Sequence, residues 1–209
     1  MAASQKSSTK PLVIDPALAL LEFSSIAAGI QAGDAMVKRA VLDVVHAGTV
    51  QPGRFLVLIG GSVAEVEEAL KAGKESAPDA LTDSVFLPGV DPAVVRALSG
   101  ARLSGNDDAM GIIETLNVPA AIQAADKGVK GAEVQLLEIR LADGLGGKGL
   151  IFFGGLVSNV EAAVELAVAA IPASQLVRQV VIPQIHEDIA KRLQTNTRFG
   201  AQLGWDKQS

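Results

Sequence analysis

Residues 122–132, "IQAADKGVKGA", repeat residues 30–40, "IQAGDAMVKRA", 92 positions further along the chain. Ile, Gln, Ala, Asp, Val, Lys and Ala occupy the same places in both segments. The match continues outward, since Glu22 corresponds to Glu114 in the same register. A repeat at a fixed spacing indicates two copies of one structural unit. The sequence therefore predicts a tandem duplication, and the fold of the chain follows from the fold of that unit.

The register between the copies changes twice. Past a glycine-bearing loop, Gly53 corresponds to Gly147, so the offset grows from 92 to 94 and the second copy carries two extra loop residues. Near the end of each copy, Pro88 corresponds to Pro183, at an offset of 95. These offsets define which residues of the two copies are matched.

The copies are predicted to span residues 18–99 and 109–194. Residues 100–108 between them are rich in Gly, Ser and Asp, which is typical of a linker. Residues 1–17 are polar and Ser-rich, lack the apolar run of a signal peptide, and predict a flexible tail. Residues 195–209 have no clear period and predict a second, loosely attached tail.

The composition excludes several classes of protein. The chain has 209 residues, of which 49% are hydrophobic and only 3% aromatic, so we expect an aliphatic core. A net charge of −5 with mixed signs argues against a nucleic-acid partner, which requires a basic face. The longest apolar runs, "FLVLIGG" and "LIFFGGLV", are far shorter than the roughly 20 residues needed to span a membrane, so we expect no membrane partner.

Candidate catalytic and metal-binding residues are scarce. The absence of cysteine excludes disulfides, thiolate-bound metal clusters and a thiol nucleophile. The only histidines, His46 and His186, do not occupy matched positions and are interpreted as structural or surface residues. The loop "ADGLGGKGL" lacks the first glycine and the final Ser or Thr of a phosphate-binding loop, because Ala142 and Gly149 occupy those places. We therefore predict no enzyme, no catalytic residue and no metal site.

Each copy alternates strand and helix periods in one order: strand, helix, strand, strand, helix, strand, short helix. Ile30, Val37 and Ala40 form an apolar stripe on the first helix. A Ser62/Glu65 capping box opens the next helix, and Asp91-Pro92 opens the short last one. The predicted strands are residues 17–23, 42–48, 54–60, 81–87, 110–115, 134–142, 149–155 and 175–182, and the longer helices are residues 28–40, 62–76, 120–132 and 158–171. This order predicts an α+β fold in which each copy has a mixed four-stranded sheet with helices on one side.

The unit resembles the shell-protein domain of bacterial microcompartments. The resemblance rests on "LEFSSIAAGIQAGDAMVKRA", on "IIETLNVPAAIQAADKGVKGA", on the glycine-bearing loops and on the proline after the fourth strand. Two copies in non-permuted order resemble the tandem-domain shell proteins, in particular the tandem type of propanediol-utilisation shells, to which "TVQPGRFLVLIGG" and "GLGGKGLIFFGG" are similar. The resemblance implies a homotrimer that imitates a hexamer, as a flat tile of the microcompartment shell in the bacterial cytoplasm.

The resemblance also implies a pore and edge contacts. Loops between second and third strands would surround a central pore, lined by Gln51, Pro52, Gly53, Asp143, Gly144, Leu145, Gly146 and Gly147. Tiles would meet other shell proteins edge to edge, through Lys38 and Lys130. Taken alone, each lysine also forms a surface ion pair with an aspartate four residues earlier. The arginine that the family often has after the fourth-strand proline is replaced by Gly89 and Gln184.

Gln51 is the most informative departure from the related subtype, which carries an iron–sulfur cluster on a cysteine at this place. Glutamine offers no thiolate, so we expect no cluster and no other cofactor. Gln51 is either a turn residue before Pro52-Gly53 or a pore residue whose amide passes small polar metabolites. The favoured function is a structural shell tile with a selective pore, and the alternative is a regulatory, small-molecule-binding α+β oligomer.

Overall fold

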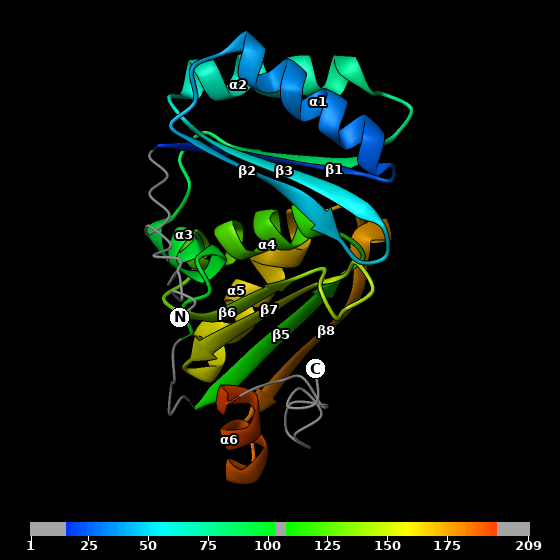
Figure 1. The fold of residues 1–209 in the computed structure, drawn as a ribbon. Coiled ribbons are helices and arrows are strands. Elements are labelled where there is room, and N and C mark those ends of the chain that lie inside the picture. The colour runs from blue at the N-terminus through cyan, green and yellow to red at the C-terminus, as the bar shows by residue number, and fades with distance from the viewer. Residues whose placement is uncertain (1–15, 103–107, 196–209) are drawn as a thin grey trace, which may run out of the picture.

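The computed structural model describes residues 16–102 and 108–195. The predicted N-terminal tail, except for its last two residues, lies outside this range, as do residues 103–107 of the predicted linker and nearly all of the predicted C-terminal tail. Each copy forms one four-stranded sheet with its own helices (Figure 1). Among the described residues, no helix combines the length and hydropathy required to cross a bilayer.

The first copy contains sheet A and three helices. Sheet A has the strand order β2-β3-β1-β4 and is formed by β1 (Ala17–Phe23), β2 (Val44–Val50), β3 (Arg54–Gly61) and β4 (Leu81–Leu87). The helices are α1 (Ile26–Arg39), α2 (Val63–Ser76) and α3 (Pro92–Leu98).

The second copy repeats this order. Sheet B has the strand order β6-β7-β5-β8 and is formed by β5 (Ala109–Thr115), β6 (Gln135–Leu141), β7 (Gly149–Gly155) and β8 (Leu176–Pro183). The helices are α4 (Val118–Gly131), α5 (Val157–Ala169) and α6 (Glu187–Thr195), with a short 3-10 turn at Ala173–Gln175. The predicted α+β fold with two copies of one unit is confirmed.

The prediction of mixed sheets is wrong, because all neighbouring strands are antiparallel. The helical connection from β1 to β2 passes over β3, and the connection from β3 to β4 passes over β1. Strands joined by a helix therefore run in the same direction but never lie next to each other. The second copy has the same arrangement, so neither sheet contains a parallel pair.

Polar side chains begin most of the helices. Ser25, Ser62, Asp91 and Asn117 each accept a hydrogen bond from a backbone N–H in the first turn of the helix that follows. Such N-cap bonds satisfy donors that the helix itself leaves unpaired. The expected cap at Ser62 is thus confirmed. By contrast, α5 begins one residue earlier than predicted and follows Leu156, which has no side-chain cap.

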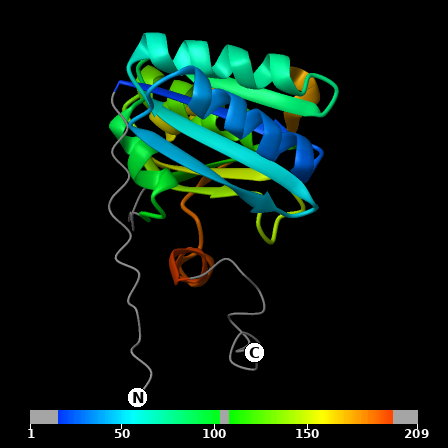
Figure 2. The ribbon, with the colours of Figure 1, turned by 45° about the horizontal axis from the view of Figure 1, so that its top comes forward.

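The two copies stack as layers in Figure 1. Helices α1 and α2 cover the outer face of sheet A, while α3 and α4 lie between sheet A and sheet B. Helices α4 and α5 cover the same face of sheet B. On the other face of sheet B lies α6 (Figures 1 and 2), whose Leu193, together with the preceding Ile185, packs against buried Met110, Leu137 and Phe152. Sheet A is therefore covered on both faces, whereas the second face of sheet B is covered only in part, by α6 and the segment before it.

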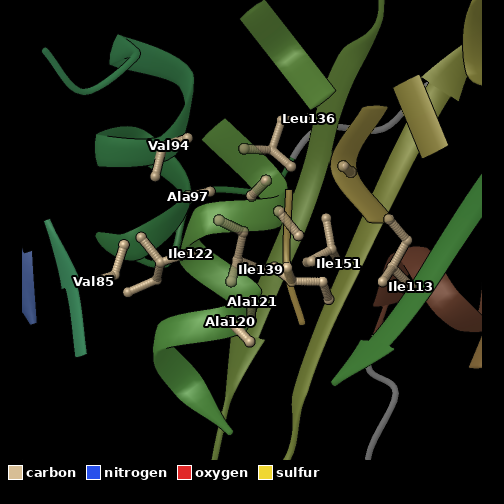
Figure 3. Close-up of a cluster of buried hydrophobic side chains, with 14 of the residues drawn as sticks. Val85, Val94, Ala97, Ile113, Ala120, Ala121, Ile122, Leu136, Ile139 and Ile151 are labelled. Atoms are coloured by element: carbon tan, nitrogen blue, oxygen red, sulfur yellow. The ribbon is translucent and has the colours of Figure 1, made fainter. Parts of the chain in front are cut away.

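The junction between the copies is a continuous apolar core. Val85 of β4 and Val94 of α3 point toward Ile122 of α4, and Leu136 and Ile139 of β6 close the cluster from the second copy (Figure 3). All of these side chains are buried. Alanines at positions 120, 121, 124 and 125 keep α4 narrow, so the helix fits between two sheets. This close packing of buried side chains holds the two copies in a fixed position relative to each other.

Candidate functional site

The two predicted pore loops lie beside each other at one end of the molecule (Figure 1). The first loop joins β2 to β3 through Gln51, Pro52 and Gly53, and the second joins β6 to β7 through residues 142–148. The backbone N–H of Gln51 donates to Oδ1 of Asp143 at 3.3 Å. The structure thus brings the two sets of predicted residues together within one chain.

Glycine is required where the loops touch. Gly147 has φ of +87°, which side chains rarely adopt. A Cβ added there would lie 3.0 Å from Cδ of Pro52 and 3.2 Å from a guanidinium nitrogen of Arg54. Both Gly144 and Gly146 also have positive φ. The glycine-rich sequence therefore permits the tight turn and the close approach of the first-copy loop.

Ion pairs anchor the strands that follow each loop. Arg54 at the start of β3 pairs with Glu22 of β1, and Lys148 beside the start of β7 pairs with Glu114 of β5 at 2.8 Å. Asp143, by contrast, uses its Oδ1 to accept the hydrogen bond from the backbone N–H of Gln51. Besides backbone groups, the two loops thus carry the amide of Gln51, the carboxylate of Asp143 and the ammonium of Lys148.

Glu22 links the first-copy loop to the junction. Its carboxylate is fully buried, and Oε2 accepts a hydrogen bond of 2.9 Å from the N–H of Val118, the first residue of α4. The N-terminus of a helix favours a negative charge. Burial nevertheless raises the pKa of Glu22, although the hydrogen bonds from Val118 and Arg54 act in the opposite direction. Sequence matching identified Glu22 as part of the repeat but gave no signal for this contact across the copies.

Further polar contacts surround the same helix end. Nδ2 of Asn117 donates to Oδ2 of Asp83 at 2.8 Å and to Oε1 of Gln175 at 2.9 Å. Asn117 is buried and also caps α4. Copy one therefore holds the start of α4 with both apolar and polar contacts.

The two predicted edge lysines have unequal surroundings. Lys130 pairs with Asp126 at 2.6 Å and donates to the carbonyl oxygen of Gly89 in the first copy. Asp126 is buried and also accepts a hydrogen bond of 2.9 Å from the N–H of Asp91. The matched pair in the first copy, Lys38 with Asp34 at 2.5 Å, is exposed on both sides. Lys130 thus already joins the copies, whereas the ion pair of Lys38 is with a neighbour on its own helix.

The histidines lie apart. His46 is exposed on β2, and His186 is exposed before α6, where its Nδ1 accepts a hydrogen bond from the N–H of Asp188 at 3.3 Å. Within the part of the chain that the structure describes, no group of three His, Asp or Glu residues could hold a metal ion, and the whole sequence lacks cysteine.

Comparison with known protein families agrees with this geometry. The family model described as the BMC domain matches residues 17–90 and again residues 109–185. The chain belongs to the BMC domain family. Its curated relatives include the bacterial microcompartment shell protein PduT of Citrobacter freundii, which is 40% identical over 85% of this chain and 97% of that protein. The carboxysome assembly protein CcmO of Synechococcus elongatus is 32% identical over 85% of this chain and 68% of its own length.

Solved structures show the same fold. A microcompartment protein from Desulfitobacterium hafniense DCB superposes with a TM-score of 0.73 at 40% identity, covering 86% of this chain and 99% of that one. A fused permuted hexameric shell protein of the RMM microcompartment gives a TM-score of 0.54 at 19% identity over 74% of this chain and 83% of its own, and shows the fold alone. The chain is therefore a structural shell protein of bacterial microcompartments and not an enzyme, which disfavours the regulatory ligand-binding alternative.

Replacement of Glu22 tests the buried carboxylate. Because burial raises the pKa of Glu22 above its usual 4.5, the folded chain holds this proton more tightly than the unfolded chain does. The wild-type free energy of unfolding should therefore fall as pH rises from 4.5 through the folded-state pKa, relative to the Glu22→Gln variant. Denaturant unfolding of both proteins at a series of pH values measures this difference. Parallel stability curves would contradict the assignment.

Replacement of the lysines tests the unequal surroundings of the matched pairs. The Lys130→Ala variant leaves buried Asp126 without its cation and should lose about 1–3 kcal/mol of stability, discounted for the partial exposure of the lysine. The Lys38→Ala variant removes an exposed helical pair and should lose no more than about 0.5 kcal/mol. Chemical denaturation of the two variants measures both values, and equal losses would show that the junction contact of Lys130 contributes nothing.

Proposed function

We propose that three chains close into a ring of six units, which forms a shell tile with the paired loops at its centre. The observation that carries this proposal is the unequal burial of matched residues in the two copies. Several apolar residues of the second copy that contact the first are buried, whereas the matched residues of the first copy are exposed.

The first helices of the two copies show this difference directly. In α4, Ile122 is fully buried against sheet A, whereas matched Ile30 in α1 is 55% exposed. Val118 is likewise fully buried, while matched Ile26 is exposed. The predicted stripe of Ile30 and Val37 therefore faces away from the core of its own copy, which α1 contacts through Gly29, Ala32 and Met36. An exposed stripe of this kind is best explained by a sheet that covers it in an assembly.

The last helices show the reciprocal difference. Val94 of α3 is fully buried at the junction, and matched Ile189 of α6 is 54% exposed. Sheet B offers the corresponding surface, since Ile112 and Val180 of its open face match Leu20 and Val85 of sheet A. Within the described residues, no helix covers sheet B at the place where α4 covers sheet A. Likewise, no sheet covers the exposed stripe of α1.

The polar contacts of the junction between the copies also have counterparts among the matched residues. Glu22 accepts from the N–H of Val118 across the junction, and the matched pair is Glu114 and the N–H of Ile26. A neighbouring chain placed as the copies are placed would let Glu114 accept from Ile26, while Asp34 would take the role of Asp126. Each chain then buries about two large aliphatic side chains more per junction, each worth roughly 1.5–3 kcal/mol.

The contact is head-to-tail, because it joins the sheet of one unit to the first helix of the next. Head-to-tail contacts close into rings when the rotation between units permits it. Shell-protein relatives of this chain support a closed tile, and three two-copy chains supply six units. We place the two units at residues 18–99 and 109–194, joined by residues 100–108. Tile edges then meet other shell proteins, with Lys38 and Lys130 as edge contacts.

The paired loops support a polar pore in this ring. Gln51, Pro52 and Gly53 of each chain would alternate with residues 143–147 around the threefold axis. The exposed groups there are amides, backbone and the carboxylate of Asp143, which suit small polar metabolites. The protein holds no iron–sulfur cluster and no other cofactor in this proposal, because Gln51 offers no thiolate to iron.

A substitution on the exposed stripe tests the ring. The wild-type protein should sediment as a trimer, and the Ile30→Glu variant should sediment as a folded monomer, since a carboxylate on the stripe cannot be buried without a partner. The Glu67→Ala variant, which alters exposed α2, is the control and should remain a trimer. Sedimentation equilibrium at micromolar concentration measures all three, and a monomeric wild type would refute the proposal.

The central position of Gln51 is tested by a thiol. Since the chain has no cysteine, the Gln51→Cys variant carries one thiol per chain, and three thiols around the axis should share one Cd²⁺ ion. The expected stoichiometry is one ion for every three chains, measured by calorimetry and by thiolate–metal absorbance. The Glu67→Cys control, on the exposed side of α2, should show no shared site. Trimers of the Gln51→Cys variant without such a site would place the pore elsewhere.

A further inference from the structure

His186 occupies the same backbone position at the start of α6 as Asp91 does at the start of α3. The carbonyl oxygen of each residue accepts hydrogen bonds from the N–H groups three and four residues later. Each side chain also accepts from the N–H two residues later, Oδ1 of Asp91 from Ala93 at 2.8 Å and Nδ1 of His186 from Asp188 at 3.3 Å. The imidazole therefore stands at the N-cap of the last helix, where the first copy has a carboxylate.

In the first copy, α4 holds this helix start. The backbone N–H of Asp91 donates to Oδ1 of Asp126 at 2.9 Å, and Lys130 pairs with Oδ2 of the same carboxylate at 2.6 Å. The side chain of Asp126 is only 2% exposed, whereas Asp91 remains partly exposed. Asp126 thus uses its two oxygens for two partners, one from each copy.

At a junction between chains, the matched groups are Asp34, Lys38 and the N–H of His186. Asp34 pairs with Lys38 through Oδ2 at 2.5 Å, the same oxygen that Asp126 offers to Lys130. The side chain of Asp34 is 57% exposed in the single chain. A neighbouring chain placed as the copies are placed would therefore bring the start of its α6 against Oδ1 of Asp34.

We propose that His186 of one chain contacts Asp34 of the next chain in the ring, and that the contact is stronger when the imidazole carries a proton. The inference rests on the proposed ring. The junction within the chain places two carboxylates side by side, those of Asp91 and Asp126. Between chains, histidine in place of the first aspartate gives a pair that can become oppositely charged. Because histidine changes its charge between about pH 5 and pH 8, closure of the ring becomes dependent on pH.

Charged groups on α6 act on the imidazole in the single chain and in the ring alike. Glu187 and Asp188 lie in the first turn of α6, with Oδ2 of Asp188 3.7 Å from Nδ1 of His186. Lys191, one turn further on, pairs with Glu187. Protonation also removes the nitrogen acceptor that caps α6, at the same cost in both states. None of these effects makes assembly depend on pH.

The groups that only the ring supplies decide the direction. From α1 of the neighbour these are Asp34 and Lys38. Matched Lys130 donates to the backbone carbonyl that follows β4, so Lys38 would be drawn toward the carbonyl of Gln184, while Asp34 contacts His186 directly. Because Asp91 stays partly exposed at the matched place, the imidazolium would keep part of its water in the ring.

His46, the other histidine, lies apart from this contact. On β2 it matches Glu138 of β6, because the two have matched partners across β3 and β7. Glu138 pairs with Arg102, beyond the C-terminal end of α3. In the ring, His46 would therefore lie toward the far end of a neighbour's α6, away from His186.

The direction of the pH dependence follows from these contacts. A proton on His186 gains an interaction in the ring that the single chain lacks, so ring formation takes up protons. The added stability is present at low pH and is lost as pH rises through the range in which imidazole titrates. An exposed ion pair changes an equilibrium constant roughly two- to fivefold, so three contacts should favour the trimer on the order of ten- to a hundredfold more near pH 6 than near pH 8.

Nuclear magnetic resonance of the histidine ring signals tests the contact. The signals are followed between about pH 5 and pH 8 in the wild-type trimer and in the Ile30→Glu variant, which the proposed ring makes monomeric. The His186 signal is the one missing from the His186→Asp variant, which carries the N-cap residue of the first copy and should still fold and form trimers. His186 should titrate at a higher pH in the trimer than in the monomer, and equal midpoints would contradict the contact.

The Asp34→Asn variant separates the charge from the shape of its partner. Asparagine keeps an oxygen that can accept from the N–H of His186 but carries no charge. Its trimer should persist, with His186 titrating as it does in the monomer. The Glu67→Gln control removes a carboxylate from the exposed side of α2 and should keep the midpoint of the wild-type trimer.

Sedimentation equilibrium near pH 6 and near pH 8, in a fixed urea concentration that dissociates part of the trimer, measures the effect on assembly. The wild type should dissociate more readily near pH 8, and the His186→Asp variant should lose most of this dependence. A wild type that is monomeric at both pH values without urea refutes the ring itself. A wild-type trimer whose stability changes with pH no more than that of the His186→Asp variant leaves the ring in place and refutes the role of His186.

Discussion

The packing of α4 against sheet A is the contact on which the rest of the molecule depends. It covers the second face of a sheet that would otherwise be open, and it buries most of the helix, leaving Lys127 and Lys130 exposed. Glu22 secures the same helix at its first turn, and Asp126 with Lys130 secures it near its last. Through this one helix the two copies become a single body, and the two loops are brought together at one end.

Much of the fold could be predicted because the pattern of each strand and helix occurs twice in the sequence. A strand or helix pattern that is ambiguous in one copy becomes credible when it recurs in register, as the stretches around Ile30 and Ile122 do. Caps such as Ser62 and Asp91 depend on neighbouring residues only, and so local sequence is enough to identify them. The direction of neighbouring strands depends on which strand a connection crosses, and no local pattern records that choice.

The candidate site was predicted less completely, for a physical reason. The pore residues came from a family resemblance, and the structure adds that Gln51 and Asp143 contact each other. Contacts between copies, such as that of Glu22 with Val118, join residues about a hundred positions apart and leave no trace in periodicity. The sequence of α1 does show two apolar sides, Met36 on one and Ile30 on the other, and a helix with two such sides requires two partners.

The covalent link between the copies has a consequence for how the junction is formed. The first unit ends with α3, and the second begins with β5 after a connection of ten residues. Arg102 of this connection pairs with Glu138 of β6 at 2.6 Å. Linked surfaces meet at a local concentration on the order of millimolar, whatever the dilution of the protein. In the proposed ring, one junction of every two would thus form within a single chain during folding. Only the other junctions of that proposed ring would depend on protein concentration, so the level of synthesis would control half of its contacts.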